Sequence, residues 1–242
     1  MAHLILNGRK ASLDENLFAS FHGSSVFTTL RSKNRVLCYW AQHWQRLCRH
    51  ARFFSYSIPK ENHVRNQIQS ALVKSNHDQK IRIIINQQFY AITIEDMVPI
   101  DQSIYQGVEV IISRYQVHPQ LAHLKTANYL PYTLALKEAQ SKGVFEALLS
   151  NQEGFVVDGS RCGLLLFKQE QFFSLEGGLE SIMREAAINF IKDSKKFSVH
   201  KKYFNQEELD GQLLLCNSLL GIVPVGAPIH PFIIKLIDYF RY

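Results

Sequence analysis

A lysine, an arginine and the start of one predicted helix are the parts of this 242-residue chain that could do chemistry. Lys125 stands in LKTANYLP (124–131), between a stretch without periodicity and a predicted helix. A lysine in such a place is most often a solvated surface charge. It becomes a nucleophile that attacks a carbonyl group only when desolvation or a neighbouring cation lowers the pKa of its amine.

Two features could bind an anion. Arg46 lies in HWQRL (43–47), where an arginine commonly lays its stem over apolar neighbours, although its planar guanidinium also suits a phosphate. The string SIMR (181–184) opens a predicted helix, where unpaired backbone N–H groups and the helix dipole favour an anion. The side chains of Ile182 and Met183, taken alone, indicate core packing.

The elements that must position these residues follow from periodicity and turn signals. Asn7-Gly8 is a strong hairpin signal, and Asp158-Gly159 on its own reads as a solvated turn. Helices are expected over 40–53, 62–76, 127–142, 181–194 and 230–240, the third capped near Gly143 and the last opening at Pro231. Strands are expected near 3–6, 10–13, 25–31, 35–39, 81–85, 90–94, 108–113, 145–150, 155–158, 163–168, 171–174 and 213–216.

The predicted strands come in hairpins rather than in regular βαβ units, which favours an α+β fold with two lobes. We expect a small α/β N-terminal lobe over residues 1–114 and an interdomain linker over 115–123. A larger, β-rich C-terminal lobe, carrying Lys125, is expected over 124–242. We find no internal repeat and no low-complexity segment.

The composition is that of an ordinary globular protein with a net charge of +6 and a sequence pI of about 9.1. Lysines and arginines are spread along the chain, so nucleic-acid binding is disfavoured. No apolar run approaches the roughly 18 residues needed to span a bilayer, and Asn7-Gly8 comes too early for a signal peptide. We expect a soluble, cytoplasmic protein with no membrane partner, no metal site and reduced thiols at Cys38, Cys48, Cys162 and Cys216.

Four strings, in this order and at these spacings, resemble the fold-type IV (class IV aminotransferase) family of pyridoxal-phosphate enzymes. They are LKTANYLP (124–131), VVDGS (156–160), SIMR (181–184) and CNSLLGIVPV (216–225). The resemblance covers most of the chain. It implies a two-lobed fold, pyridoxal 5'-phosphate as the cofactor, a small anionic substrate and a homodimer.

The resemblance also implies site residues. Lys125 would form the Schiff base with the cofactor, and Asp158 would pair with the pyridine nitrogen. Arg46 would bind the phosphate together with the backbone amides of Ile182 and Met183. Asn217 and Ser218 stand where the family has a Gly-Thr pair that completes the phosphate site, and the serine keeps the hydroxyl.

Several positions depart from the family pattern. Asp158 stands where the family usually has Glu, and Gly163 where it usually has Asn. Arg161 is an unusual neighbour that could compete for the Asp158 carboxylate. The segments at 86–89 and after Phe173 are short, and Ser24-Ser25 replaces a usual Asp-Gly.

The string HGSSVFTT (22–29) discriminates between members of the family. Transaminases mostly have Glu at the position of Thr28 and often Tyr at that of His22. The Phe-Thr-Thr pattern favours the aminodeoxychorismate lyases, as do Ile182-Met183 and Asn217. The implied reaction is an elimination that gives 4-aminobenzoate and pyruvate in folate biosynthesis. Thr28 is a candidate catalytic residue beside Lys125, positioning either its amine or the departing enolpyruvyl group.

Three alternatives stay open. The nearest is a D-amino-acid or branched-chain aminotransferase on the same scaffold. The second is a catalytically degenerate relative, suggested by the altered Glu and Asn positions. The most distant is a basic nucleic-acid-binding protein.

Overall fold

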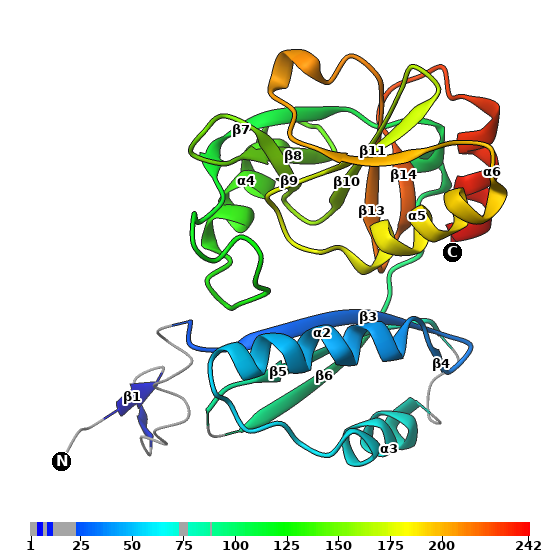
Figure 1. Ribbon diagram of the computed structural model, residues 1–242. Helices are drawn as coiled ribbons and strands as arrows, with labels where there is room; N and C mark the ends of the chain where they lie inside the picture. Colours follow the sequence, from blue (N-terminus) through cyan, green and yellow to red (C-terminus); the bar gives the residue numbers. More distant parts are fainter. Residues whose placement is uncertain (1–3, 7–8, 12–22, 73–76, 88) are drawn as a thin grey trace. The chain divides into compact units, whose positions relative to one another are not determined.

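The computed structural model describes residues 4–6, 9–11, 23–72, 77–87 and 89–242, and shows a mixed α and β architecture with several sheets (Figure 1). Contacts divide the chain into two compact units. One is Met1–Asp96 with Lys125–Asn128, and the other is Met97–Leu124 with Tyr129–Tyr242.

This division differs from the boundaries that we predicted at 114 and 123. Strand β7 (Val110–Gln116) pairs in parallel with β8 (Glu146–Ser150), so residues 97–114 join the second unit. The segment predicted as a linker starts inside β7, and the Val117 amide continues the pairing with a bond to the Ser150 carbonyl. Residues 125–128 belong to the first unit because they pair with its β3 strand.

The first unit is a four-stranded antiparallel sheet with two helices. The sheet has the order β4-β3-β5-β6, and β1 and β2 of the predicted N-terminal hairpin form a separate antiparallel pair. The elements are β1 (Leu4–Leu6), β2 (Arg9–Ala11), β3 (Val26–Lys33), β4 (Val36–Leu37), α2 (Trp40–Phe53), α3 (Glu61–Leu72), β5 (Gln79–Ile85) and β6 (Tyr90–Asp96). Helix α2 has its predicted bounds, whereas residues 73–76 of the second predicted helix lie outside the described residues.

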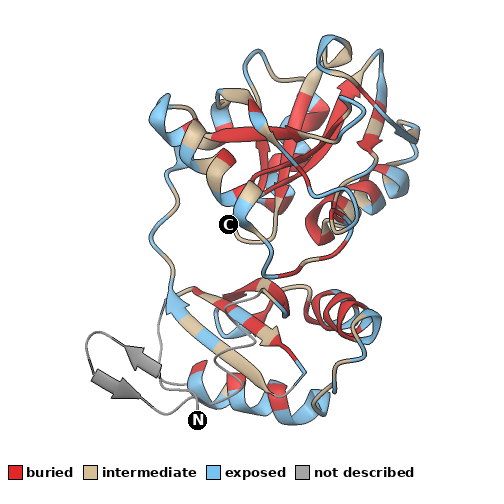
Figure 2. Ribbon diagram, turned by 90° about the vertical axis from the view of Figure 1, so that its left-hand side faces the viewer, coloured by how far each residue is buried: buried red, intermediate tan, exposed pale blue. Residues whose placement is uncertain are grey.

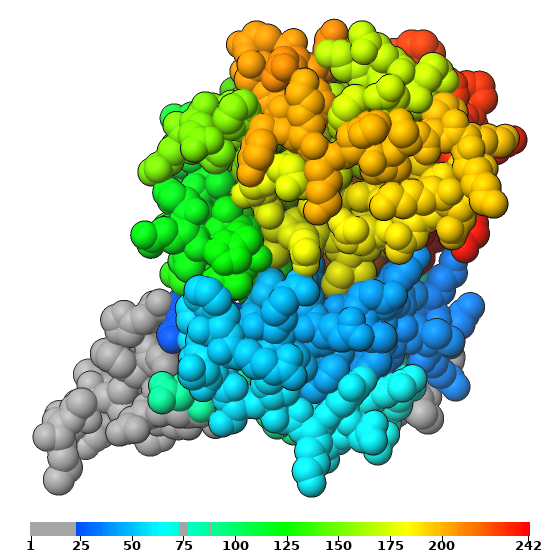
Figure 3. Space-filling view, viewed as in Figure 1, coloured from blue at the N-terminus to red at the C-terminus, as the bar shows by residue number. Residues whose placement is uncertain are grey.

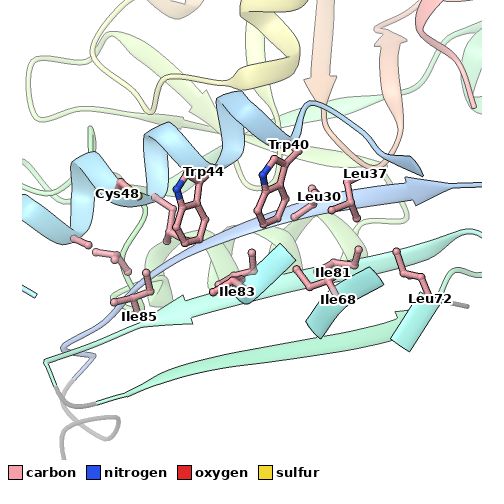
Figure 4. Packing of buried hydrophobic residues seen from close by; sticks show 14 residues of the cluster. Leu30, Leu37, Trp40, Trp44, Cys48, Ile68, Leu72, Ile81, Ile83 and Ile85 are labelled. Carbon is pink, nitrogen blue, oxygen red and sulfur yellow. The ribbon is translucent and has the colours of Figure 1, made fainter. Parts of the chain in front are cut away.

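The two helices cover one face of this sheet, and α2 and α3 form the light-blue and cyan surface in Figure 3. Along β5 the alternation is strict, since Ile81, Ile83 and Ile85 are fully buried while Arg82 between them is exposed. Figure 4 shows Trp40 and Trp44 of α2 reaching toward these isoleucines. The indole rings are stacked with centroids 5.6 Å apart. Burial of each such side chain stabilises the unit by roughly 2–3 kcal/mol.

The second unit contains a five-stranded sheet, a three-stranded sheet and three α-helices among its described residues. The sheets have the orders β12-β11-β10-β13-β14 and β7-β8-β9. Its further elements are the 3-10 helices η1 (Gln102–Gln106) and η2 (Gln206–Glu208), the α-helices α4 (Leu130–Ser141), α5 (Ile182–Ser194) and α6 (Pro231–Phe240), and the strands β9 (Val156–Gly159), β10 (Gly163–Lys168), β11 (Gln171–Leu175), β12 (Val199–Lys202), β13 (Gln212–Asn217) and β14 (Gly221–Pro224).

The strands of this unit are largely buried, as Figure 2 shows. Helix α4 begins at Leu130, three residues later than predicted, because Pro131 fits only the first turn and residues 125–127 pair with β3 instead. Helix α6 begins at Pro231 as predicted. Within the part of the chain that the structure describes, no helix has the length and apolar character to cross a membrane.

Candidate functional site

The backbone of Lys125 is fixed on both sides within the first unit. Its carbonyl accepts the amide of Phe27 at 2.9 Å, and residue 126 forms an antiparallel bridge with Val26. Its own amide donates to Nδ1 of His50 at 3.1 Å. The segment thus lies alongside the start of β3, and the side chain of Lys125 projects from a backbone that is hydrogen-bonded on both sides.

The side chain of Lys125 shares an aromatic ring with a second cation. Its Nζ lies 4.7 Å from the centroid of the Phe27 ring, and Cζ of Arg82 lies 5.1 Å from the same centroid. Arg82 also donates from Nε to the Thr29 hydroxyl at 3.3 Å. Phe27 and Thr29 pair with Ile84 and Arg82, so all lie on the sheet face away from the helices. Our sequence reasoning missed Arg82 and gave Thr29 no role beyond the Phe-Thr-Thr pattern, although the alternation of buried and exposed residues in β3 and β5 could have indicated that the two lie on one face.

Thr28 lies on the opposite, helix-covered face. Its side chain is fully buried beneath α2, where Oγ1 lies 2.7 Å from Nδ1 of His43 and accepts from Nη2 of Arg46 at 3.2 Å. The pKa of His43 is held well below its usual value by burial first, and then by the charges of Arg46 and Lys125. Thr28 and Arg46, both predicted site residues, are therefore in direct contact. The described contacts of the Thr28 hydroxyl are with His43 and Arg46, not with the amine of Lys125.

Asp158 is a buried carboxylate on β9 in the second unit. Its Oδ2 accepts the amide of Leu179 at 3.4 Å, and its side chain is hydrogen-bonded to the hydroxyl of Tyr132 on α4. The pKa of Tyr132 is raised, first by burial and then by the charge of Asp158, so this phenol stays protonated and donates. The sequence reading of a solvated hairpin aspartate is wrong, because strand pairing encloses it.

A second set of contacts holds the loop that supplies the Leu179 amide. Buried Arg184 of α5 donates to the carbonyls of Leu175 and Leu179, at 3.0 and 3.3 Å. A Cβ atom on Gly178 would lie 2.3 Å from the Val157 carbonyl oxygen, so only glycine permits this close approach to β9. Arg184 and Gly178 thereby set the surroundings of Asp158.

The start of α5 is built as an anion site would be. Ser181 caps the helix, accepting the Arg184 amide at 3.3 Å through Oγ, and its carbonyl accepts the Glu185 amide. Neither bond uses the amides of Ile182 and Met183 at the head of the helix. Gly163 explains one departure from the family pattern, since a Cβ atom there would lie 2.3 Å from Cβ of Ser181.

The side chain of Asn217 organises its own loop. Its Oδ1 accepts the Leu219 amide at 2.7 Å, and its Nδ2 donates to the Arg161 carbonyl at 2.8 Å. Half-buried Ser218 is the next residue, so the fixed loop presents it at the end of β13. Asn217 can therefore contribute to an anion site through the loop conformation that it imposes.

Arg161 does not turn to Asp158, as its proximity in sequence had suggested. Its Nε lies 3.3 Å from Oε2 of Glu146, a fully buried carboxylate that also accepts from the Ser160 hydroxyl and, at 3.2 Å, from the Cys162 thiol. The pKa of the Cys162 thiol is raised well above its usual value, by burial and then by Glu146. This cluster, which sequence reasoning missed, fixes the turn after Asp158 and leaves Cys162 unreactive.

The predicted site residues thus form two groups, one in each unit. The first unit carries Lys125, Arg46 and Thr28, of which Arg46 and Thr28 are in contact with each other, while His22 of the discriminating string lies outside the described residues. The second unit carries Asp158, Ile182, Met183, Asn217 and Ser218. Among the described residues, no group of three or more His, Cys, Asp or Glu side chains could hold a metal ion.

Comparison with known proteins shows to which family the chain is similar. The model of the family "Amino-transferase class IV" matches residues 25–227. A solved structure named "Putative 4-amino-4-deoxychorismate lyase" is 37% identical, with a TM-score of 0.93 over 99% of this chain and 98% of that one. A branched-chain aminotransferase of Thermoproteus uzoniensis, solved with norvaline, is 21% identical, with a TM-score of 0.79 over 98% and 92% of the two chains, which shows a shared fold.

Curated relatives include both lyases and transaminases. The aminodeoxychorismate lyase of Vibrio harveyi is 24% identical over 227 residues, covering 85% of this chain and 83% of the relative. The chloroplastic D-amino-acid transaminase of Arabidopsis thaliana is 27% identical over 189 residues, covering 71% of this chain and 48% of the relative. The matched part of the chain thus spans about half the length of that transaminase.

Proposed function

The chain belongs to the class IV aminotransferase family, and within that family we propose that it is a pyridoxal-phosphate-dependent 4-amino-4-deoxychorismate lyase. The observation that carries the proposal is the 37% identity, over nearly the whole of both chains, to the solved structure that bears this name. The similarity to the lyase of Vibrio harveyi supports it, as does the Phe-Thr-Thr string at 27–29.

The residues present fit pyridoxal phosphate. The buried carboxylate of Asp158 suits a pyridinium nitrogen, because an ion pair compensates the cost of burying both charges. In the second unit, the Ile182 and Met183 amides at the start of α5 and the Ser218 hydroxyl suit the phosphate dianion. In the first unit, the guanidinium of Arg46 has the chemistry to bind the same group. Lys125, projecting from a backbone segment that is hydrogen-bonded to Phe27 and His50, would hold the aldehyde carbon covalently.

When bound, the cofactor supplies an electron sink for the substrate's amine-bearing carbon. The chain's own residues then have defined tasks. Asp158, whose side-chain oxygens accept from Tyr132 and the Leu179 amide, would pair with the pyridine nitrogen and favour its protonated form. Lys125 would act as the general base that takes the ring hydrogen of the substrate. Breaking of the ring C–O bond would release enolpyruvate, which becomes pyruvate on receiving the proton taken from the ring, and would leave the aromatic amine.

The charge of the first unit suits the proposed substrate, which is a dicarboxylate. Arg82 places a cation beside the Phe27 ring, which Lys125 also contacts, on the face away from the helices. A carboxylate would be attracted to that face, and an arginine there can bind it through two parallel hydrogen bonds.

We also propose a homodimer, for which the expected result is twice the mass of the 27.9 kDa chain in light scattering after gel filtration.

The second candidate is a transaminase on the same scaffold. It is favoured by the similarity to the transaminase of Arabidopsis thaliana and by the shared fold of branched-chain aminotransferases. The cofactor contacts named above would serve either reaction, so the substrate decides between them.

Two measurements test the proposal. The protein reconstituted with pyridoxal phosphate should absorb near roughly 410–430 nm, as expected of a lysine imine, and lose the band on borohydride reduction and in Lys125→Ala. Incubation with 4-amino-4-deoxychorismate should then release 4-aminobenzoate and pyruvate in equal amounts. Turnover only of an amino acid with 2-oxoglutarate would establish the transaminase instead. A protein that cannot be reconstituted would reject both and identify a degenerate relative.

A further inference from the structure

The Thr28 hydroxyl is the meeting point of a histidine and an arginine from one face of α2. His43 and Arg46 are three residues apart on the helix, and both reach Oγ1 of Thr28, at 2.7 and 3.2 Å. All three side chains are buried, with Thr28 at 0%, His43 at 1% and Arg46 at 6% exposure. Nε2 of His43 is also buried and has no hydrogen-bond partner among the described residues.

The hydrogens available on Thr28, His43 and Arg46 determine which group donates in each of these two hydrogen bonds. Arg46 can only donate, so one lone pair of Oγ1 accepts its Nη2 hydrogen. If the neutral imidazole carries its hydrogen on Nδ1, it also donates to Oγ1, and the hydroxyl hydrogen is left in a buried site without an acceptor. If the hydrogen is on Nε2, the hydroxyl donates to Nδ1 and both bonds of Thr28 are satisfied. Of the hydroxyl and the imidazole, only the Nε2–H is then left without a partner among the described residues, whereas the first arrangement leaves both the hydroxyl hydrogen and Nε2 unpaired. The second arrangement leaves fewer buried polar groups unpaired and is therefore the more stable.

We propose that His43, as the Nε2–H tautomer, is a positioning residue that turns the Thr28 hydroxyl so that its oxygen faces and holds the guanidinium of Arg46. The Thr28 oxygen then accepts from the Arg46 guanidinium and orients it, and the bond from the Thr28 hydroxyl to Nδ1 of His43 fixes the orientation of the hydroxyl. This inference rests on the cofactor part of the proposed function, because it assigns to Thr28 and His43 the task of presenting Arg46 to a phosphate.

The chemical character of the two partners supports this role. The lowered pKa of His43 keeps the imidazole neutral, and a hydroxyl is neutral as well. Together they hold Arg46 in place without adding negative charge beside it. A carboxylate in the place of either group would compensate part of the guanidinium's charge, whereas the hydroxyl and the neutral imidazole compensate none of it.

The direction of the bonds can be measured without cofactor or substrate. In long-range proton–nitrogen NMR spectra of the protein with labelled histidine, each ring nitrogen reports whether it carries hydrogen. We expect His43 to show a protonated Nε2 and a bare Nδ1, assigned by the loss of its signals in His43→Asn. A protonated Nδ1, alone or together with Nε2, would overturn the proposed direction.

To test whether Thr28 orients Arg46 toward a phosphate, the measurement must separate binding of the phosphate group from binding of the rest of the cofactor. Thr28→Val removes the hydroxyl at nearly constant volume, and should weaken the binding of pyridoxal phosphate about tenfold while leaving the binding of pyridoxal, which lacks the phosphate, unchanged. Thr28→Ser keeps the hydroxyl and should restore most of the affinity. Arg46→Met should cost at least as much as Thr28→Val, and the double variant should lose no more than Arg46→Met alone.

The controls separate this idea from simple misfolding. His63→Leu alters an exposed histidine on α3 and should change neither affinity. Equal weakening of pyridoxal and pyridoxal phosphate in Thr28→Val would show a structural role only, and would overturn the inference. A wild-type protein that binds neither compound would reject the proposed function and the phosphate role together, while the NMR result would still decide the bond direction.

Discussion

The backbone amide of Lys125 donates to Nδ1 of His50 at 3.1 Å, so a buried histidine of α2 holds the residue that is proposed to carry the cofactor. On the other side of the residue, its carbonyl accepts the Phe27 amide. The imidazole can accept only while Nδ1 carries no hydrogen. The position of Lys125 is thereby tied to a helix and a strand that are far from it in sequence.

Replacing His50 should loosen Lys125. His50→Leu removes the acceptor, and we expect the Lys125 amide to exchange with deuterium up to about tenfold faster, since one hydrogen bond stabilises by roughly 0.5–1.5 kcal/mol. His50→Asn offers an amide oxygen near the same place and should restore part of the protection. Mass spectrometry of a peptide covering 124–128 measures this, with His63→Leu as the control. Equal exchange in His50→Leu and wild type would show that the bond does not hold the segment.

Gly163 should resist replacement by the family's usual asparagine. In Gly163→Asn the new Cβ would fall 2.3 Å from Cβ of Ser181 and displace the cap of α5. We expect a loss of stability of roughly 1–3 kcal/mol, typical of overpacking, measured by urea denaturation. Gly163→Ala should lose stability by the same contact, and Gly163→Ala combined with Ser181→Gly should recover part of it despite the lost cap. Strictly additive losses in that pair would contradict the steric explanation.

Asp158 should not tolerate the longer glutamate, although the family usually has it. Cβ of Asp158 lies 3.1 Å from where a Cβ of Gly178 would stand, so the space around this carboxylate is limited. We expect Asp158→Asn to lower kcat about 100-fold through loss of the charge, and Asp158→Glu to retain less than half of the wild-type cofactor. Tyr132→Phe removes only one hydrogen bond and should cost about tenfold in kcat. A fully active Asp158→Asn would remove this residue from the mechanism.

His43 should make the folded protein less stable in acid. Its pKa in the folded state lies well below the usual 6.5, so the unfolded chain takes up a proton at a pH where the folded chain does not. Stability is therefore complete above about pH 6.5 and falls as the pH drops below it, by up to about 1.4 kcal/mol per unit, until the folded-state pKa is reached. Urea midpoints at pH 7.5 and 5.5 should differ more in the wild type than in His43→Asn. An unchanged difference would show that other groups dominate.

Many helices and strands could be predicted from the sequence because their apolar residues recur at helical or strand spacing within a short segment. The spacing of Trp40, Trp44 and Leu47 predicts α2 with its observed bounds, and the apolar run at 163–168 predicts β10. Boundaries that depend on pairing at a distance could not be found in this way. Nothing local to residues 97–114 shows that β7 pairs with β8, or that residues 125–128 belong with β3.

The site divides along the same line. The sequence by itself was enough to single out Lys125, Arg46, Asp158 and the start of α5 as candidate site residues, because each lies in a short string whose residue types and spacing can be recognised. Only the tertiary structure decided that Thr28 faces Arg46 while Thr29 faces Arg82. Adjacent residues of a strand point to opposite faces, and which face the helices cover is settled by packing. Only the tertiary structure, likewise, brought His50 to the Lys125 amide and Tyr132 to Asp158, because hydrogen bonds between distant segments leave no periodic signal in a single chain.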